Sequence, residues 1–138
     1  MRGAASQDWE WLKGDVNDVT NVYEYQILAT DGGGTVSANS QSTQTNLFFG
    51  YAPCANMTNI FGTIVTHFYD INSGKYKNYT SQNGDDNEGA GYCSLFAGTI
   101  AKSAPISKIS IHVGASGAMD TVAGSRYDLF GILPRMVS

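Results

Sequence analysis

The last third of the chain constrains the fold most, because it contains two strand-like runs joined by a glycine-rich connection. The first run covers residues 106–113 and the second covers residues 125–133, with residues 114–124 between them. Apolar and polar residues alternate in the first run, which is typical of a half-buried strand. We therefore expect the two runs to form a β-hairpin that completes a β-sandwich.

The residues before this hairpin are also typical of β-structure. Residues 22–28 and 92–101 are rich in aromatic and β-branched side chains, which favour strands. The longest apolar run, residues 60–71, is apolar on both faces and predicts a central strand that is covered on both sides. Residues 37–45 are almost entirely polar and predict either a long loop or a flat edge strand.

A chain of 138 residues predicts a single domain. Turns rich in Gly, Asn and Ser separate roughly seven or eight short strands, a pattern typical of an all-β sandwich or jelly roll. We expect residues 21–138 to form an antiparallel, jelly-roll-like β-sandwich. Residues 1–20 predict a short N-terminal arm, which fits either one helical turn or an extended segment.

Two tryptophans stand close together in this expected arm. Trp9, Trp11 and the neighbouring Leu12 lie beside a polar run. Tryptophans in such a position usually anchor a segment onto a surface, which is either the body of the same chain or a partner. We therefore take Trp9, Trp11 and Leu12 as the candidate partner-binding residues.

The charge of the chain excludes some classes of partner. Only 14% of the residues are charged and the formal net charge is −4, so we expect no nucleic acid partner, because phosphate binding needs basic side chains. No apolar run approaches the length of a membrane span, and the first residues lack the apolar centre of a signal peptide. We expect no membrane partner, and a protein that is used in a cytoplasm or assembled into a particle there.

No motif in the sequence points to catalysis. The two histidines, His67 and His112, each fall in a strand-like run, and with Cys54 and Cys93 they show no metal-ligand spacing. The acidic cluster at residues 85–88 does not match a calcium loop. We therefore expect no catalytic residue, no metal, no cofactor and no enzymatic activity. For the two cysteines we expect free, partly buried thiols, although one disulfide is compatible with the sequence.

The order of the C-terminal motifs carries a further signal. The motifs are Tyr69-Asp70, Gly74-Lys75 with Lys77, an aromatic strand with Phe96 and Gly98, Ala104-Pro105-Ile106-Ser107-Lys108-Ile109, and the closing run at residues 123–132. This order resembles the terminal pattern of small jelly-roll virion proteins of tailed bacteriophages. Their closing strand reads Gly-Ser-x-x-x-Leu-Tyr-Gly-Ile, and here Phe130 replaces the usual Tyr.

The resemblance implies a component of a virus particle that is assembled in the host cytoplasm. Two roles follow from it, namely a capsid decoration or cement protein that stabilises the phage head, and a tail or head fibre knob that binds a receptor or glycan. Because few residues precede the β-rich body, we favour the decoration protein. The partners implied are the major capsid protein or tail and fibre proteins, together with further copies of the chain, with a homotrimer favoured.

Overall fold

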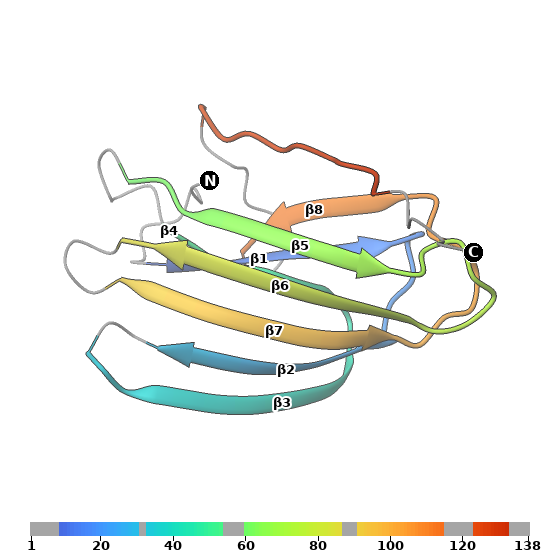
Figure 1. Ribbon diagram of the computed structural model, residues 1–138, viewed down its shortest axis with the longest axis horizontal. Helices are drawn as coiled ribbons and strands as arrows, with labels where there is room; N and C mark the ends of the chain where they lie inside the picture. The colour runs from blue at the N-terminus through green and yellow to red at the C-terminus, as the bar shows by residue number, and fades with distance from the viewer. Residues whose placement is uncertain (1–8, 31–32, 54–59, 87–90, 115–122, 133–138) are drawn as a thin grey trace, which may run out of the picture.

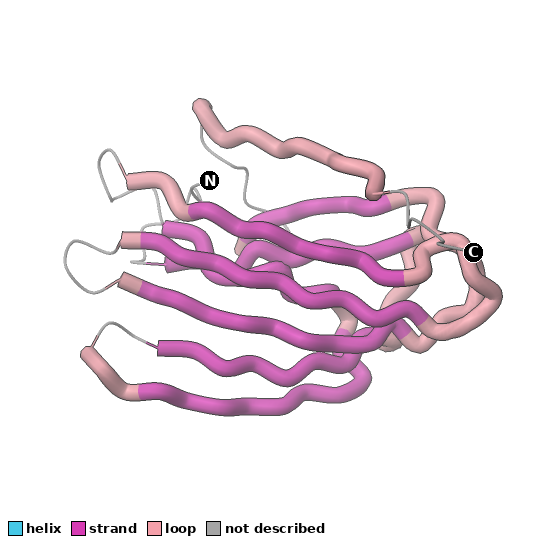
Figure 2. The backbone as a smooth tube through the Cα atoms, in the orientation of Figure 1, coloured by secondary structure: helices cyan, strands magenta, loops and turns pink. Residues whose placement is uncertain are grey.

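The structure is a computed structural model, and it describes residues 9–30, 33–53, 60–86, 91–114 and 123–132. These residues form eight strands and no helix (Figure 2). The strands are β1 (Trp9–Val16), β2 (Tyr23–Thr30), β3 (Val36–Gln44), β4 (Leu47–Pro53), β5 (Thr63–Tyr69), β6 (Lys77–Asp85), β7 (Tyr92–Ile100) and β8 (Ile109–Val113).

The strands build two antiparallel sheets that face each other (Figure 1). One sheet has five strands in the order β3-β2-β7-β6-β5, and the other has three in the order β4-β1-β8. The chain passes between the sheets after β1, β3, β4 and β7. The expected all-β sandwich is therefore confirmed, whereas the strand order does not by itself identify a jelly roll.

Side chains alternate between the core and the solvent along the central strands. In β2 the buried residues are Tyr23, Tyr25, Ile27 and Ala29, and the residues between them are exposed. Such alternation is expected where one face of a sheet packs on another and the opposite face meets water. Rings from both sheets fill the space between them, and Tyr25 contacts Phe48 of the three-stranded sheet with ring centroids 4.9 Å apart.

The expected N-terminal arm covered residues 1–20, but Trp9–Val16 form β1 and belong to this sandwich, which corrects that expectation for the described residues. Strand β1 lies at the centre of its sheet and pairs with both β4 and β8. Leu12 and Val16 are each only 2% exposed. The segment joins the sheet because burying these apolar side chains stabilises the strand, and because both of its edges find hydrogen-bonding partners.

Two further expectations about strand position are wrong. Strand β5, which lies within the long apolar run, is an edge strand of the five-stranded sheet and not a central one. The closing run at residues 125–132 is extended but pairs with no described strand, so the expected terminal hairpin with β8 is not formed. By contrast, β3 is the polar edge strand that we considered.

Candidate interaction surface

Two of the three expected anchor residues, Trp11 and Leu12, pack inside the chain's own body. The ring of Trp11 lies 4.4 Å from that of Tyr51 and 4.8 Å from that of Phe48, measured between centroids. Leu12 belongs to the core cluster and offers no surface to a partner, so its assignment as a partner-binding residue is wrong. Trp9 pairs with Pro53 through the backbone of β1, and its side chain lies outside the described part of the structure.

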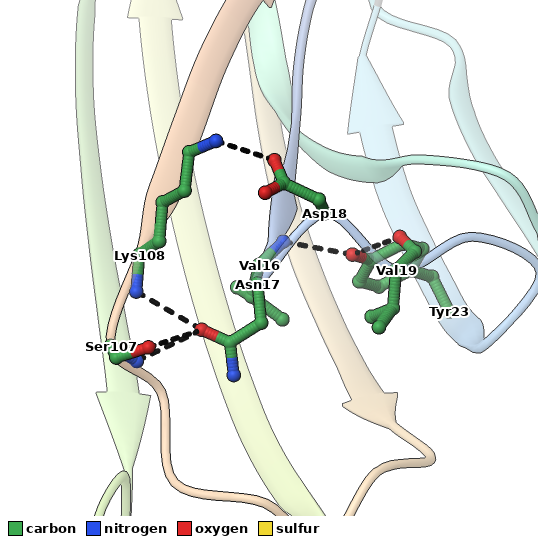
Figure 3. A network of polar contacts seen from close by, with 7 residues as sticks. All are labelled: Val16, Asn17, Asp18, Val19, Tyr23, Ser107 and Lys108. Carbon is green, nitrogen blue, oxygen red and sulfur yellow. Dashed lines mark hydrogen bonds and ion pairs between the residues drawn. The ribbon is translucent and has the colours of Figure 1, made fainter.

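Several residues behind the phage-protein resemblance hold the loops of the sandwich together (Figure 3). The side-chain oxygen of Asn17 accepts hydrogen bonds from the backbone N–H groups of Ser107 and Lys108, at 2.9 and 3.0 Å. Its amide nitrogen donates to the carbonyl of Pro105 at 2.8 Å. The turn after β1 is thereby fastened to the segment that leads into β8.

Tyr23 fastens the same turn from the other side (Figure 3). Its hydroxyl donates to the carbonyl of Val19 at 2.9 Å and accepts from the backbone N–H of Val16 at 2.8 Å. A tyrosine that bonds back to the backbone a few residues upstream is a recurrent corner device of β-sandwiches. Burial raises the pKa of this hydroxyl, so it remains a donor throughout the neutral range.

Lys77 and Gly98 also serve packing. The ammonium of Lys77 is buried and donates to the carbonyls of Ser73, Lys75 and Ser103 at 2.6, 2.5 and 2.9 Å. Gly98 faces the Tyr79 ring on the neighbouring strand, and a Cβ at this position would approach the ring carbon Cζ to 2.9 Å. Lys77 and Gly98 thus stabilise the fold.

The histidines and the cysteine that the structure describes, which are candidate nucleophiles, bases and metal ligands, do not lie close together. His67 is exposed on β5, which lies in the five-stranded sheet, and His112 lies on β8 in the other sheet. Cys93 is a free thiol and is exposed, not partly buried as we expected, while Cys54 lies outside the described residues. Among the described residues, no three His, Cys, Asp or Glu side chains are grouped so that they could hold a metal ion.

The hydroxyl-bearing residues inside the sandwich form a polar layer of their own. The Ser81 hydroxyl donates to the carbonyl of Phe49 at 2.5 Å, and Ser94 donates to the side chain of Asn83. Ser81 and Ser94 face the core, whereas His67 is on the solvent-facing side of the same sheet. A histidine on the opposite face cannot take a proton from these hydroxyls, because general-base catalysis needs hydrogen-bonding contact.

The pKa shifts in the described residues come mainly from burial. Desolvation raises the pKa of Tyr51 to about 12, and it also raises the pKa of Tyr79. Desolvation raises the pKa of the Asp85 carboxyl too, although a hydrogen bond from the backbone N–H of Tyr92 opposes this effect. The neighbouring Asp86 carboxylate raises the pKa of Asp85 further. Shifts that come mainly from desolvation accompany packing.

The most distinctive surface is an apolar patch on the outer face of the five-stranded sheet. It consists of Leu28, Val36, Val65 and Leu95, which are 41–64% exposed. Leu28 pairs directly with Leu95 across β2 and β7, and the four side chains line one shallow hollow of the outer face. We call these four residues the outer-face patch. The exposed Gln82 on β6 stands between Leu95 and Val65. Exposed apolar side chains gathered on one face mark interaction sites on soluble proteins.

The second unusual surface is the C-terminal segment, defined here as residues 123–132. Leu129, Phe130 and Ile132 are 87%, 81% and 77% exposed. No backbone group of the segment hydrogen-bonds to another described residue. Burying a side chain of this size usually stabilises a protein or complex by about 1.5–3 kcal/mol. Burial of these three side chains against a partner would therefore favour association strongly.

The sequence analysis missed these two surfaces as interaction sites. A signal for the outer-face patch was present, because Leu28 lies at an outward position of β2, whose other exposed residues, Glu24 and Gln26, are polar. Leu95 lies at an outward position of β7. Their strand partners depend on the register between strands distant in sequence, so their grouping became visible only in the fold.

No family model matches the chain, and no curated protein and no solved structure matches it. The described residues include no helix with the length and apolar character needed to cross a membrane.

Proposed function

We propose that the chain is a non-catalytic structural protein of a tailed-bacteriophage virion, specifically a jelly-roll-like capsid decoration protein. In this role it binds and stabilises the phage head. The observation that carries the proposal is the outer-face patch, in which Leu28 and Leu95 stand side by side on a regular antiparallel sheet. A broad, shallow apolar face suits docking onto another protein surface better than enclosing a small molecule.

The small fraction of charged residues in the chain supports the same role. Charged residues make up 14% of the sequence, well below the usual quarter for soluble domains. The centre of a protein–protein interface is characteristically poor in charged residues. A chain that covers much of its surface with neighbouring subunits therefore needs fewer charged side chains than one that stays alone in solution.

The second candidate function is a fibre knob that binds glycans. Polar and aromatic side chains on the outer face of the five-stranded sheet, at the end away from the outer-face patch, favour it. There the exposed Tyr69 hydroxyl lies 3.0 Å from the hydroxyl of Thr80, and Thr99 donates to the side chain of Asn78 at 3.0 Å. An aromatic ring beside polar groups is a usual combination in carbohydrate recognition. Binding on a glycan array that Tyr69→Ala abolishes would favour this candidate over the decoration protein.

Co-sedimentation with purified particles of the source phage tests the main proposal. We expect the wild-type chain to sediment with the particles, and the double variant Leu28→Asp/Leu95→Asp to lose this binding. The matched control is Gln26→Asp/Ala97→Asp, because these residues form the neighbouring exposed pair on the same two strands. Absence of wild-type binding, or equal binding by the patch variant, would refute the proposal.

A further inference from the structure

The C-terminal segment has the geometry of a strand that lacks a partner. It is extended, and its backbone makes no hydrogen bond to any other described residue. Large apolar residues point to both of its sides, because Leu129 and Phe130 are neighbours and are both more than four-fifths exposed. A row of unpaired N–H and C=O groups with exposed apolar side chains readily pairs with another chain.

Gly131 adds to this geometry. A Cβ at Gly131 would meet no atom within 4 Å, so nothing in the isolated chain requires glycine there. Glycine within a strand often marks a place where another backbone approaches closely. The space beside Gly131 is therefore open to a backbone from outside this subunit.

The chain also carries an unprotected edge that suits such a strand. Among the described strands, β5 pairs only with β6. It contains no Lys or Pro, which are residues that commonly protect edges. Its inner residues Ile64 and Phe68 contact the core but are only partly buried. A strand added beyond β5 would continue the sheet and cover them.

The other described edges are less suitable. Strand β3 is mostly polar and is irregular, with a register shift opposite Tyr23 and a positive φ of 55° at Thr43. Strand β8 spans only five residues. Strand β4 contains Gly50 and ends at Pro53, and these residue types weaken or interrupt an edge strand. Among the described edges, β5 is thus the one that is regular, apolar and accessible.

We propose that the C-terminal segment of one copy adds as a strand to the free edge of β5 in a second copy. Donor and acceptor lie on the same chain, so each copy gives one segment and receives another. A repeated contact of this kind closes into a ring when the rotation between copies allows it. In Figure 1 the segment (red) runs along the side of the molecule that carries β5 and β8.

Strand addition of this kind gives the proposed virion protein a means of assembling with its own copies. Only this biological purpose, and not the strand pairing itself, rests on the proposed function. The first test is the mass of the wild-type chain in solution, measured by light scattering across a range of concentrations. We expect an oligomer for the wild type and a single chain of 14.8 kDa for Phe130→Asp. Because Phe130 is largely exposed, this variant should retain the circular dichroism spectrum of a folded monomer.

Matched variants identify the surface. Tyr76→Asp changes another exposed aromatic residue, 62% exposed, outside both the segment and β5, and should leave the oligomer intact. Ile132→Asp tests the segment at a second position and should dissociate the oligomer as Phe130→Asp does. A monomeric wild type, or an oligomer that withstands both segment variants, would overturn the inference.

Hydrogen–deuterium exchange assigns the acceptor. In the wild-type oligomer we expect slow amide exchange both in residues 125–132 and in β5, and faster exchange in both regions in Phe130→Asp. Loss of the oligomer without any change in β5 would overturn β5 as the acceptor. Particle binding is measured separately, so a chain that assembles as expected but ignores the phage head contradicts the proposed function alone.

Discussion

The side-chain oxygen of Asn17 accepts a hydrogen bond from the backbone N–H of Lys108 at 3.0 Å, across 91 positions of sequence. Asn17 adopts a positive φ of 51°, a conformation that Asn tolerates better than most residues. The turn after β1 and the segment before β8 are thereby held together where the chain passes between the two sheets. An ion pair of 2.6 Å between Lys108 and Asp18 lies beside this contact.

Removing the Asn17 side chain should destabilise the protein. We expect Asn17→Gly to lower the free energy of unfolding by about 1–3 kcal/mol, because several hydrogen bonds are lost while the positive φ is accommodated. Asn17→Ala should cost about 1 kcal/mol more, because a Cβ disfavours this φ. Urea denaturation measures both values. Equal stability of Asn17→Gly and the wild type would show that the contact does not hold the turn.

Gly98 should tolerate no side chain. We expect Gly98→Ala to lower the free energy of unfolding by about 1–3 kcal/mol, because the added methyl group overlaps the ring of Tyr79. The matched control is Gly84→Ala on β6, where a Cβ meets nothing within 4 Å. Thermal denaturation of both variants provides the comparison, and a similar loss in the two would contradict the packing argument.

The buried ammonium of Lys77 should be essential for stability. We expect Lys77→Met to lower the free energy of unfolding by about 3 kcal/mol, because three backbone carbonyls lose their charged donor. Lys75→Met is the control, because Lys75 is exposed and only its backbone takes part. If both methionine variants unfold at the same denaturant concentration, the ammonium does not stabilise these loops.

Trp11 should act on folding and not on partner binding. Its ring packs on Phe48 and Tyr51, so we expect Trp11→Ala to cost about 3–5 kcal/mol of stability. Trp11→Phe should restore much of this loss by keeping an aromatic ring in the same space. A stable Trp11→Ala variant with the wild-type unfolding midpoint would show that the ring contributes little to the core.

Asp85 should make the stability depend on pH. Desolvation raises its folded-state pKa above the usual 3.8, so the folded protein binds more protons than the unfolded chain between the two pKa values. This contribution to the stability therefore increases as the pH falls through the folded pKa and is lost as the pH rises. Asp85→Asn should gain stability relative to the wild type as the pH rises from about 3 to 7.

Urea denaturation at several pH values measures this dependence for Asp85. Glu24→Gln, on the exposed face of β2, serves as the control for removal of one negative charge. If the stability difference between Asp85→Asn and the wild type is the same at every pH, burial does not shift the titration of Asp85 in the folded protein.

Local sequence patterns sufficed for the β-rich character and for much of the strand content. The aromatic and β-branched side chains in residues 22–28 predicted a strand, and the structure places β2 there, at Tyr23–Thr30. Glycine-rich and asparagine-rich turns marked the breaks between strands. The motif residues Lys77 and Gly98 were visible in the sequence, although their contacts were not.

Only the tertiary structure decided which strands have two neighbours and which are edges. The apolar residues of β5 suggested a central strand, yet β5 lies at an edge, and the expected arm became the centre of the smaller sheet. Alternation reports the faces of a strand but says nothing about its edges, because edge pairing depends on backbone hydrogen bonds between distant segments. The same holds for the outer-face patch. The sequence by itself determined that Leu28 and Leu95 are apolar, but only the register of β2 on β7 placed them side by side on one surface.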